Sequence, residues 1–389
     1  MDLSYIIPPV DRELIKKELK QKHFLRKTNR GNKEIYITTA HLSPNIMREI
    51  GRLRELSFAL DGGGTGKDCD IDEFDTLPEP HCFKQLFVWS PEDEEIVGGY
   101  RFIHGSNMFT RDDGTIATPT SELFQYSDHF INDILPYTLE LGRAFVQPAF
   151  QPGNDVRKGL YSLDNLWDGI GGLALEIPET LYFFGKITMY SQMNRRAKEM
   201  ILYFLQKHFP DRDGLVWPYK AMEIQSDFNE LHAIFTGRNY KEDYQILLHH
   251  VRELGCTVPA MINAYMNLSP TMRCFGTAMN HDFGETDETG ILVTINDIKP
   301  DKRERYLESY NTKNSILDRI HLLRTTPKRM PWWRQTNDQE SADLQELREL
   351  KDLQRMREEL REKQKELKLE LKNIKKARRR MKKDQKDED

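Results

Sequence analysis

The chain has 389 residues, of which 38% are hydrophobic, and it contains 19 Phe, 15 Tyr and 5 Trp. This content supports a large folded core and excludes a fully disordered chain. The formal net charge is -5 at pH 7, but residues from Asp338 onward carry 17 Lys and Arg against 15 Asp and Glu, which leaves 40 against 47 in the preceding part. This acidic larger part disfavours nucleic acid as a partner.

The cysteines and the N-terminus indicate a cellular compartment. The four cysteines are too far apart to form paired CxxC metal ligands, so we expect free thiols in a reducing cytosol and no metal site. The first residues, MDLSYIIPPVDRE, lack the basic and then apolar order of a secretory signal. No apolar run approaches the ~18 residues of a membrane span. We therefore expect a cytoplasmic protein whose contact with a membrane is peripheral.

The first hundred residues predict helices and strands in alternation. Ser43 precedes a proline, which is typical of a helix N-terminus, and apolar residues then recur at helical spacing. Alternating or continuous apolar runs predict the strands. The expected elements are helices over Asp11 to Lys22 and Pro44 to Leu60, a strand over Glu34 to Thr39, and a hairpin of Phe83 to Trp89 with Glu95 to Ile103.

An acidic segment, Asp68 to Asp75, lies before this hairpin. It does not match a calcium-binding loop, because Glu73 stands where that loop needs its turn glycine. The remaining alternatives are attraction of a substrate ammonium group or a solvated acidic loop. Within the hairpin, Arg101 interrupts an apolar strand and needs a partner, because burial of an unpaired charge is costly.

The stretch from Tyr137 to Trp167 is the strongest candidate for a site. It is an apolar strand interrupted by Glu140 and Arg143, then a break with Pro and Gly, then a helix. A helix N-terminus after such a break offers backbone N–H groups to an anion or to a developing oxyanion. The loop also carries Arg157 and Lys158. The alternative is an ordinary strand-to-helix connection in which Glu140 and Arg143 pair with each other.

Further elements follow without a strict βαβ order. We expect one mixed α/β domain over residues 1–310, because strands and helices intermix and no internal repeat is present. The expected elements are a helix capped by Ser162 and running to Ala174, a strand over Leu181 to Tyr190, helices over Asn194 to Phe209, Glu242 to Leu254 and Pro259 to Leu268, and strands over Arg273 to Met279 and Gly290 to Asn296.

The last eighty residues predict a connector, residues 311–337, and a charged helical tail, residues 338–389. In the connector, Trp332 and Trp333 stand among basic residues, a composition typical of a membrane-interface anchor or of a cover over a core edge. In the tail, apolar residues recur every seven positions from Leu353 to Met381, which predicts a weak coiled-coil seam or a long solvated helix.

The tail ends in a basic run, Leu371 to Lys383, with eight basic and no acidic residues. Such a run favours anionic lipid, with nucleic acid as the second choice. We therefore expect attachment to the inner face of the cytoplasmic membrane, which flotation with charged and neutral vesicles can test. The proposed contacts are Trp332, Trp333, Lys375, Lys376, Arg378, Arg379 and Arg380.

Several segments occur in the order found in one known family. They are LREL at Leu53 to Leu56, DCDIDEFD at Asp68 to Asp75, GGYRF at Gly98 to Phe102, LELGRAFVQP at Leu139 to Pro148, and LYFFG at Leu181 to Gly185. This set resembles the hemolysin-like N-acyltransferases, which include ornithine-lipid and glycine-lipid synthases and are related to acyl-homoserine-lactone synthases within the GNAT-like superfamily.

The resemblance implies transfer of a long acyl chain from acyl-carrier protein to an amino acid's α-amine in aminolipid biosynthesis. It also implies a GNAT-like α/β fold, with a bent mixed sheet splayed at the strand that holds Glu140 and Arg143. The donor brings its own phosphopantetheine, so no cofactor is expected. Because the loop after Pro148 lacks an RGxG-like pyrophosphate signature, a CoA donor is less favoured. Matching positions suggest Arg54, Asp72, Asp75, Arg101, Glu140 and Arg143 as the polar site.

The residue types fit this chemistry. A carboxylate such as Glu140 can accept the proton that an ammonium nucleophile must lose. Arg101 or Arg143 could hold a substrate carboxylate, while the acidic segment attracts the ammonium group. Arg157 and Lys158 could bind the acidic surface of the carrier protein or the phosphate of its phosphopantetheine. Glycine is favoured slightly over ornithine, because no further carboxylate can be assigned to a side-chain ammonium.

Two other functions remain open at this point. One is synthesis of an acyl-homoserine-lactone-type signal, which the long part beyond Tyr190 disfavours. The other is a non-catalytic GNAT-like scaffold whose tail mediates interactions. The sequence also leaves the oligomeric state open, a homo-oligomer included.

Overall fold

The computed structural model describes residues 2–151, 159 and 161–308. Several sequence predictions lie outside these residues and stay predictions: the two domain boundaries after residues 310 and 337, the charged helical tail, and the contacts assigned to Arg157, Lys158, Trp332, Trp333, Lys375, Lys376, Arg378, Arg379 and Arg380. All four cysteines are free, as predicted.

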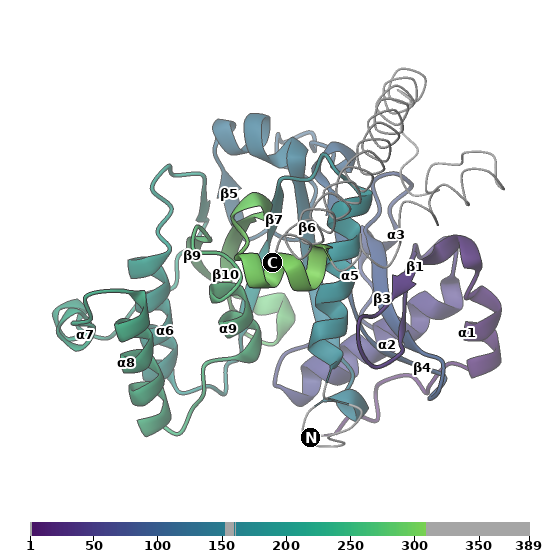
Figure 1. The fold of residues 1–389 in the computed structure, drawn as a ribbon, viewed down its shortest axis with the longest axis horizontal. Helices are drawn as coiled ribbons and strands as arrows, with labels where there is room; N and C mark the ends of the chain where they lie inside the picture. The colour runs from purple at the N-terminus through teal and green to yellow at the C-terminus, as the bar shows by residue number, and fades with distance from the viewer. Residues whose placement is uncertain (1, 152–158, 160, 309–389) are drawn as a thin grey trace, which may run out of the picture. The chain divides into compact units, whose positions relative to one another are not determined.

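The centre of the fold is a mixed sheet of eight strands in the order β1-β2-β3-β4-β6-β7-β10-β9. Figure 1 shows β1 and β3 toward the right of the view and β10 and β9 toward the left. All neighbours are antiparallel except β6 and β7, which are parallel. The strands are β1 Phe24–Lys27, β2 Glu34–Thr38, β3 Lys84–Ser90, β4 Glu95–His104, β6 Thr138–Val146, β7 Tyr182–Met189, β9 Arg273–Asn280 and β10 Thr286–Thr294.

Helices cover the sheet, and β5 Phe124–Tyr126 pairs with β8 Val216–Pro218 in a small second sheet. In Figure 1, α5 crosses the middle of the view, and α6 and α8 lie side by side beyond β9. The helices are α1 Arg12–Glu18, α2 Pro44–Leu60, α3 Glu73–Thr76, α5 Ser162–Glu176, α6 Arg195–His208, α7 Phe228–Ile234, α8 Tyr240–Glu253, α9 Ala260–Met266 and α10 Pro300–Arg303. Within the described residues, none of them is both long and apolar enough to cross a membrane.

The predicted mixed α/β fold is therefore confirmed, and most predicted elements are present within a few residues. The differences are local. The strands β1, β5 and β8 and the helices α3, α7 and α10 were not predicted, because each is too short to show a periodic apolar pattern. Ser162 was predicted to cap α5, but it is the first residue of the helix. The N-cap residue is Tyr161, and its side chain makes no capping hydrogen bond.

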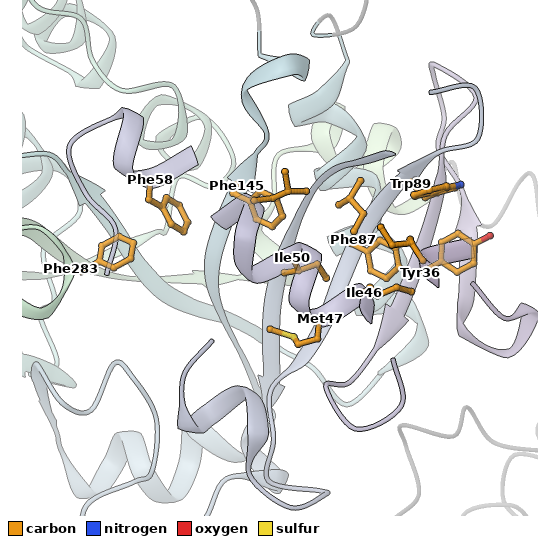
Figure 2. Close-up of a cluster of buried hydrophobic side chains, with 12 residues drawn as sticks. Tyr36, Ile46, Met47, Ile50, Phe58, Phe87, Trp89, Phe145 and Phe283 are labelled. Carbon is orange, nitrogen blue, oxygen red and sulfur yellow. The ribbon is translucent and has the colours of Figure 1, made fainter. Parts of the chain in front are cut away.

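Helices α2 and α5 pack on opposite faces of the sheet. Helix α2 presents Ile46, Met47 and Ile50 at helical spacing, and Figure 2 shows them gathered with Phe87 of β3 and Phe145 of β6. On the other face, Gly169 of α5 lies so close to Leu86 that an added Cβ would be 2.6 Å from a Leu86 methyl carbon. Because Leu86 and Phe87 are consecutive in β3, their side chains point to opposite faces.

The sheet splays between β6 and β7. These strands pair only from Thr138 to Leu141 against Tyr182 to Gly185. Beyond that point β6 continues along β4 while β7 continues along β10. A bulge in β6 accompanies the change: the register with β4 shifts between Gly99 and Arg101, and Arg143 has a φ of 48°. The splay predicted from the family resemblance is therefore present at the expected strand.

Gly185 ends the paired part of β7 and is needed for close approach. A Cβ built on it would lie 2.5 Å from the Leu141 carbonyl oxygen. We expect Gly185→Ala to lower the free energy of unfolding by about 1 to 3 kcal/mol, because the two strands must move apart. Denaturant titration of the purified variant measures this loss.

The matched control is Gly142→Ala on the other side of the splay. A Cβ there would meet Arg101 Nε at 3.6 Å, an ordinary contact. We expect its stability to stay close to that of the wild type. Equal stability of the two variants would contradict the close-approach argument.

Candidate functional site

A cavity of about 670 Å³ lies at the splay. It is lined by residues from both faces of the sheet, so it extends through the gap between β6 and β7. This volume is within the usual range for small-molecule sites. The local reason for the cavity is that the two strands diverge after Leu141 and Gly185 and no strand fills the gap between them.

The end of the cavity on the α2 face is polar. Residues opposite each other in a sheet share a face, and so do residues two apart along one strand. The register places Arg101 opposite Gly142, which is two residues from Glu140, and Glu140 opposite Phe184, which is two residues from Lys186. Arg101, Glu140 and Lys186 therefore share this face, and all three line the cavity.

The end on the α5 face is apolar. It is formed by strand residues that point away from α2, together with side chains of α5 and α9. An acyl chain placed here would be surrounded by aliphatic and aromatic groups, which favours its transfer from water. The apolar and aromatic lining residues at this end include Tyr100, Leu141, Leu166, Phe183, Met261, Tyr265, Ile291 and Val293, while Ser162 and Asp164 at the start of α5 add polar groups.

Glu140 lies where the polar end meets the splay. Its residue is 2% exposed, and its Oε1 accepts a hydrogen bond of 2.7 Å from the Thr120 hydroxyl. Its Oε2 is buried and has no hydrogen-bond partner among the described residues. Burial raises the pKa of Glu140, although the Thr120 hydrogen bond and the charge of Lys186 act in the opposite direction. A buried carboxylate with a raised pKa and one unused oxygen is suited to accept a proton.

Three arginines and three aspartates form a balanced network beside the cavity. Arg54 of α2 is fully buried, and its Nη1 lies 3.1 Å from Asp75. Arg101 of β4 donates to Asp72 at 2.6 Å and to Asp75 at 3.2 Å. Each charge has a partner of opposite sign, which offsets the cost of removing it from water.

Arg143 completes this network at the bulge of β6. Its Nε donates to Asp70 at 2.8 Å, and its guanidinium stacks 4.4 Å from the ring centre of Phe283. Arg143 therefore pairs with Asp70 and not with Glu140, so the alternative of a Glu140 to Arg143 pair is wrong. Because Arg143 does not pair with Glu140, the Glu140 carboxylate can interact with a ligand in the cavity that it lines.

The acidic segment is largely internal. Asp70 and Asp75 are 1% and 0% exposed, while Asp68 and Glu73 are exposed. Burial alone would raise the pKa of Asp72, but Arg101, Arg143 and Arg54 outweigh it and lower this pKa to about 2. The solvated-loop alternative is thus wrong for the inner aspartates, because their charges compensate the three arginines.

The sequence did not single out four polar residues near this site. Thr120 holds Glu140, and Gln85 bridges Arg54 and Asp75. Lys186 and Glu288 pair at 3.1 Å and both line the cavity. The signal for Lys186 was present, because its charge interrupts an apolar strand just as Glu140 does, whereas Glu288 lies in the polar first half of β10. Thr120 carries no such signal, since an uncharged residue in a loop has no distinctive pattern.

The structure brings together most of the site residues predicted from the sequence. The members of the network are Arg54, Asp72, Asp75, Arg101 and Arg143. Glu140 is outside the network and lines the cavity together with Arg101 and Arg143. Arg157 and Lys158 are not among the described residues. In the described part of the chain, no group of three or more His, Cys, Asp or Glu residues is arranged to hold a metal ion.

Comparison with known proteins gives two kinds of match. A model of the acetyltransferase (GNAT) domain matches residues 53–158. Two relatives named glycine N(alpha)-acyltransferase, from Bacteroides thetaiotaomicron and Phocaeicola vulgatus, are each 50% identical over 308 residues. The matched part is 79% of this chain and 91% and 94% of the two relatives. No solved structure matches the chain.

The network generates a stability prediction. Asp75→Asn removes the carboxylate shared by Arg54 and Arg101 and leaves buried cations without full compensation. We expect the free energy of unfolding to fall by about 3 to 5 kcal/mol. Chemical denaturation at neutral pH measures the change.

An exposed pair provides the control. Arg12 lies 2.6 Å from Glu95, and its side chain is 55% exposed. Arg12→Ala should cost less than about 1 kcal/mol, because solvent screens the pair. If Asp75→Asn costs no more than this control, the network is not a structural requirement.

Proposed function

This chain belongs to the GNAT-fold N-acyltransferase family, and from that premise we propose that it transfers a long-chain acyl group from acyl-carrier protein to the α-amine of glycine. The observation that carries the proposal is the position of Glu140. Glu140 lines the cavity where an apolar and a polar compartment meet, and one of its carboxylate oxygens has no hydrogen-bond partner among the described residues. An acyl thioester and an amino acid need such a junction, because one is apolar and the other is charged.

The reaction is acyl transfer from a thioester to an amine. Glu140 removes a proton from the ammonium group, directly or through water, and the free amine attacks the thioester carbonyl carbon. The carbon–nitrogen bond forms, the carbon–sulfur bond breaks, and the electron pair leaves with sulfur as a thiolate. The nitrogen is positively charged after the carbon–nitrogen bond forms, and its second proton passes to the thiolate. The proton held by Glu140 passes to solvent, which restores the carboxylate.

The splay supplies the stabilisation of the tetrahedral intermediate in this proposal. Residues of β6 beyond Leu141 have no β7 partner, while their other edge pairs with β4. Backbone N–H groups in a strand alternate between its two edges, so those on the β7 side are directed toward the gap. A fixed N–H group directed at the developing oxyanion lowers the barrier, since it needs no reorganisation.

Two considerations support acyl-carrier protein as the donor. The segment after Pro148 lacks the RGxG-like pyrophosphate signature of acetyl-CoA enzymes. The apolar end of the cavity also suits a long chain more than an acetyl group. The donor would bring its own phosphopantetheine, so the proposal needs no resident cofactor. An N-acylated amino acid with a long chain is an aminolipid, which is the pathway we assign.

Glycine is the acceptor that we propose. The relatives are named for glycine, and four carboxylates line the cavity: Asp61, Glu140, Asp164 and Glu288. Asp164 pairs with Arg305 and Tyr306, and Glu288 pairs with Lys186. With Glu140 assigned as the base, only Asp61 would remain among the described lining residues for the side-chain ammonium of ornithine. Glycine needs no such partner.

A thiol-release assay tests the proposal directly. Purified protein with long-chain acyl-carrier protein should release free thiol only when glycine is added, with ornithine as the weaker acceptor. The product should be N-acylglycine by mass spectrometry. A preference for acetyl-CoA as donor, or release that no amino acid stimulates, would contradict the assignment and favour a non-catalytic scaffold.

The role of Glu140 predicts a loss of turnover and a pH effect. Glu140→Gln should lower turnover roughly 100-fold in a folded protein, the scale expected for loss of a general base. In the wild type, activity should fall as pH drops through the raised pKa of Glu140, because only the carboxylate accepts the proton.

Thr120→Val sharpens this test. The Thr120 hydrogen bond lowers the pKa of Glu140, so its removal should raise that pKa further. The acidic limb of the profile of kcat/KM against pH should therefore move to higher pH, while Glu140→Gln should abolish the limb. Wild-type turnover in folded Glu140→Gln would exclude Glu140 as the base.

A further inference from the structure

The pair of Lys186 and Glu288 lies in the cavity and has no role in the mechanism above. Lys186 Nζ is 3.1 Å from Glu288 Oε2 and donates to the Pro119 carbonyl oxygen at 3.0 Å. The two side chains are 13% and 4% exposed. A lysine ammonium has three donors, and the contacts found for Lys186 use two of them. One donor is therefore available to the cavity.

The two strands place Lys186 beside Glu140. If pairing continued past Leu141 and Gly185, Gly142 would lie opposite Lys186. Because the strands diverge there, the space between Gly142 and Lys186 belongs to the cavity. Phe184, opposite Glu140, and Lys186 are two residues apart, which is about 7 Å along a strand. Lys186 and Glu140 both line this part of the cavity, so an acceptor with an amine and a carboxylate on one carbon can contact both side chains there.

The other cations of the cavity wall are engaged elsewhere. Arg101 is held by Asp72 and Asp75, and Arg143 is held by Asp70 with Asp72 at 3.7 Å. Lys186 is outside that balanced network and pairs with a single carboxylate. A substrate carboxylate would therefore meet less competition at Lys186 than at either arginine.

We propose that Lys186, held in place by Glu288 and the Pro119 carbonyl, binds the carboxylate of the acceptor amino acid and so presents the α-nitrogen to Glu140. This inference rests on the proposed function and adds the residue that recognises the acceptor. Glu288 is a positioning residue here: it orients the ammonium group and does not touch the reacting atoms. Loop residues 119 and 120 link both groups, since Pro119 accepts from Lys186 and Thr120 donates to Glu140.

The test compares two acceptors that differ only in the carboxylate. Glycinamide keeps the α-amine of glycine but replaces the carboxylate by a neutral amide. Lys186→Met should raise KM for glycine about 10- to 100-fold, the loss expected for one charge-assisted hydrogen bond. When both proteins are measured at a pH above the acidic limb, where Glu140 is ionised with or without the charge of Lys186, kcat/KM for glycinamide should change less than about threefold. Lys186→Arg, which keeps the charge, should recover part of the preference for glycine.

A matched control is a second buried lysine whose carboxylate partner, Asp287, is next to Glu288 in β10 and points to the opposite face. Lys198 of α6 lies 2.5 Å from Asp287 of β10, and both side chains are as buried as the Lys186 pair, but neither lines the cavity. Lys198→Met should leave the ratio of glycine to glycinamide activity unchanged. Should Lys186→Met fold poorly, the double variant Lys186→Met with Glu288→Gln removes the unpaired buried charge, and the same ratio is measured.

The outcomes separate this inference from the function on which it rests. Equal losses with glycine and glycinamide in the Lys186 variants would overturn the carboxylate assignment and leave the acyltransferase proposal standing. The absence of any glycine-dependent thiol release by the wild type would overturn the proposed function, and the acceptor assignment with it. A selective loss of glycine activity supports both.

Discussion

The divergence of one pair of strands governs the rest of this structure. β6 and β7 are the only parallel neighbours in the described eight-stranded sheet, and they remain paired over just four residues each. Past Leu141 and Gly185, each strand follows its other neighbour. The gap opens the sheet to both faces, so an apolar compartment under α5 and a polar compartment under α2 become one cavity. No separate domain or lid is required to bring these two environments together.

The network of three arginines and three aspartates holds the polar side in shape. It links α2, α3, β4 and the bulge of β6 through Arg54, Asp72, Arg101 and Arg143. Buried ion pairs seldom add much net stability, because desolvation offsets their attraction. Their removal one partner at a time is nevertheless costly. The network therefore fixes the position of the bulge, and with it Glu140, more than it raises the stability of the whole fold.

The sequence predicted the larger elements, and the family resemblance named the six residues suggested as the polar site, but neither gave the partners of these residues. Glu140 and Arg143 were identifiable because charges in an apolar strand require an explanation. The burial of Asp70 and Asp75 and the partial burial of Asp72 could not be predicted, because residue spacing does not show that three arginines from other elements surround them. Lys186 was not singled out, although it interrupts β7 in the same way. Tertiary partners, and not local propensity, decide which of these charges face a cavity.

The environment of Glu140 shows how such a fold can keep a carboxylate useful as a base. Burial alone would drive the group toward its neutral form, which cannot accept a proton. The Thr120 hydrogen bond and the charge of Lys186 favour the ionised form and limit that shift. The arginines nearby have aspartate partners, so they stabilise the Glu140 carboxylate less than free cations would. A general base needs a pKa between these extremes. A carboxylate that its partners stabilise fully is too weak a base, and one that is fully desolvated stays protonated. The same Lys186 that moderates the pKa of Glu140 also lies where an acceptor carboxylate would be held, so acceptor binding and base strength are coupled through one side chain.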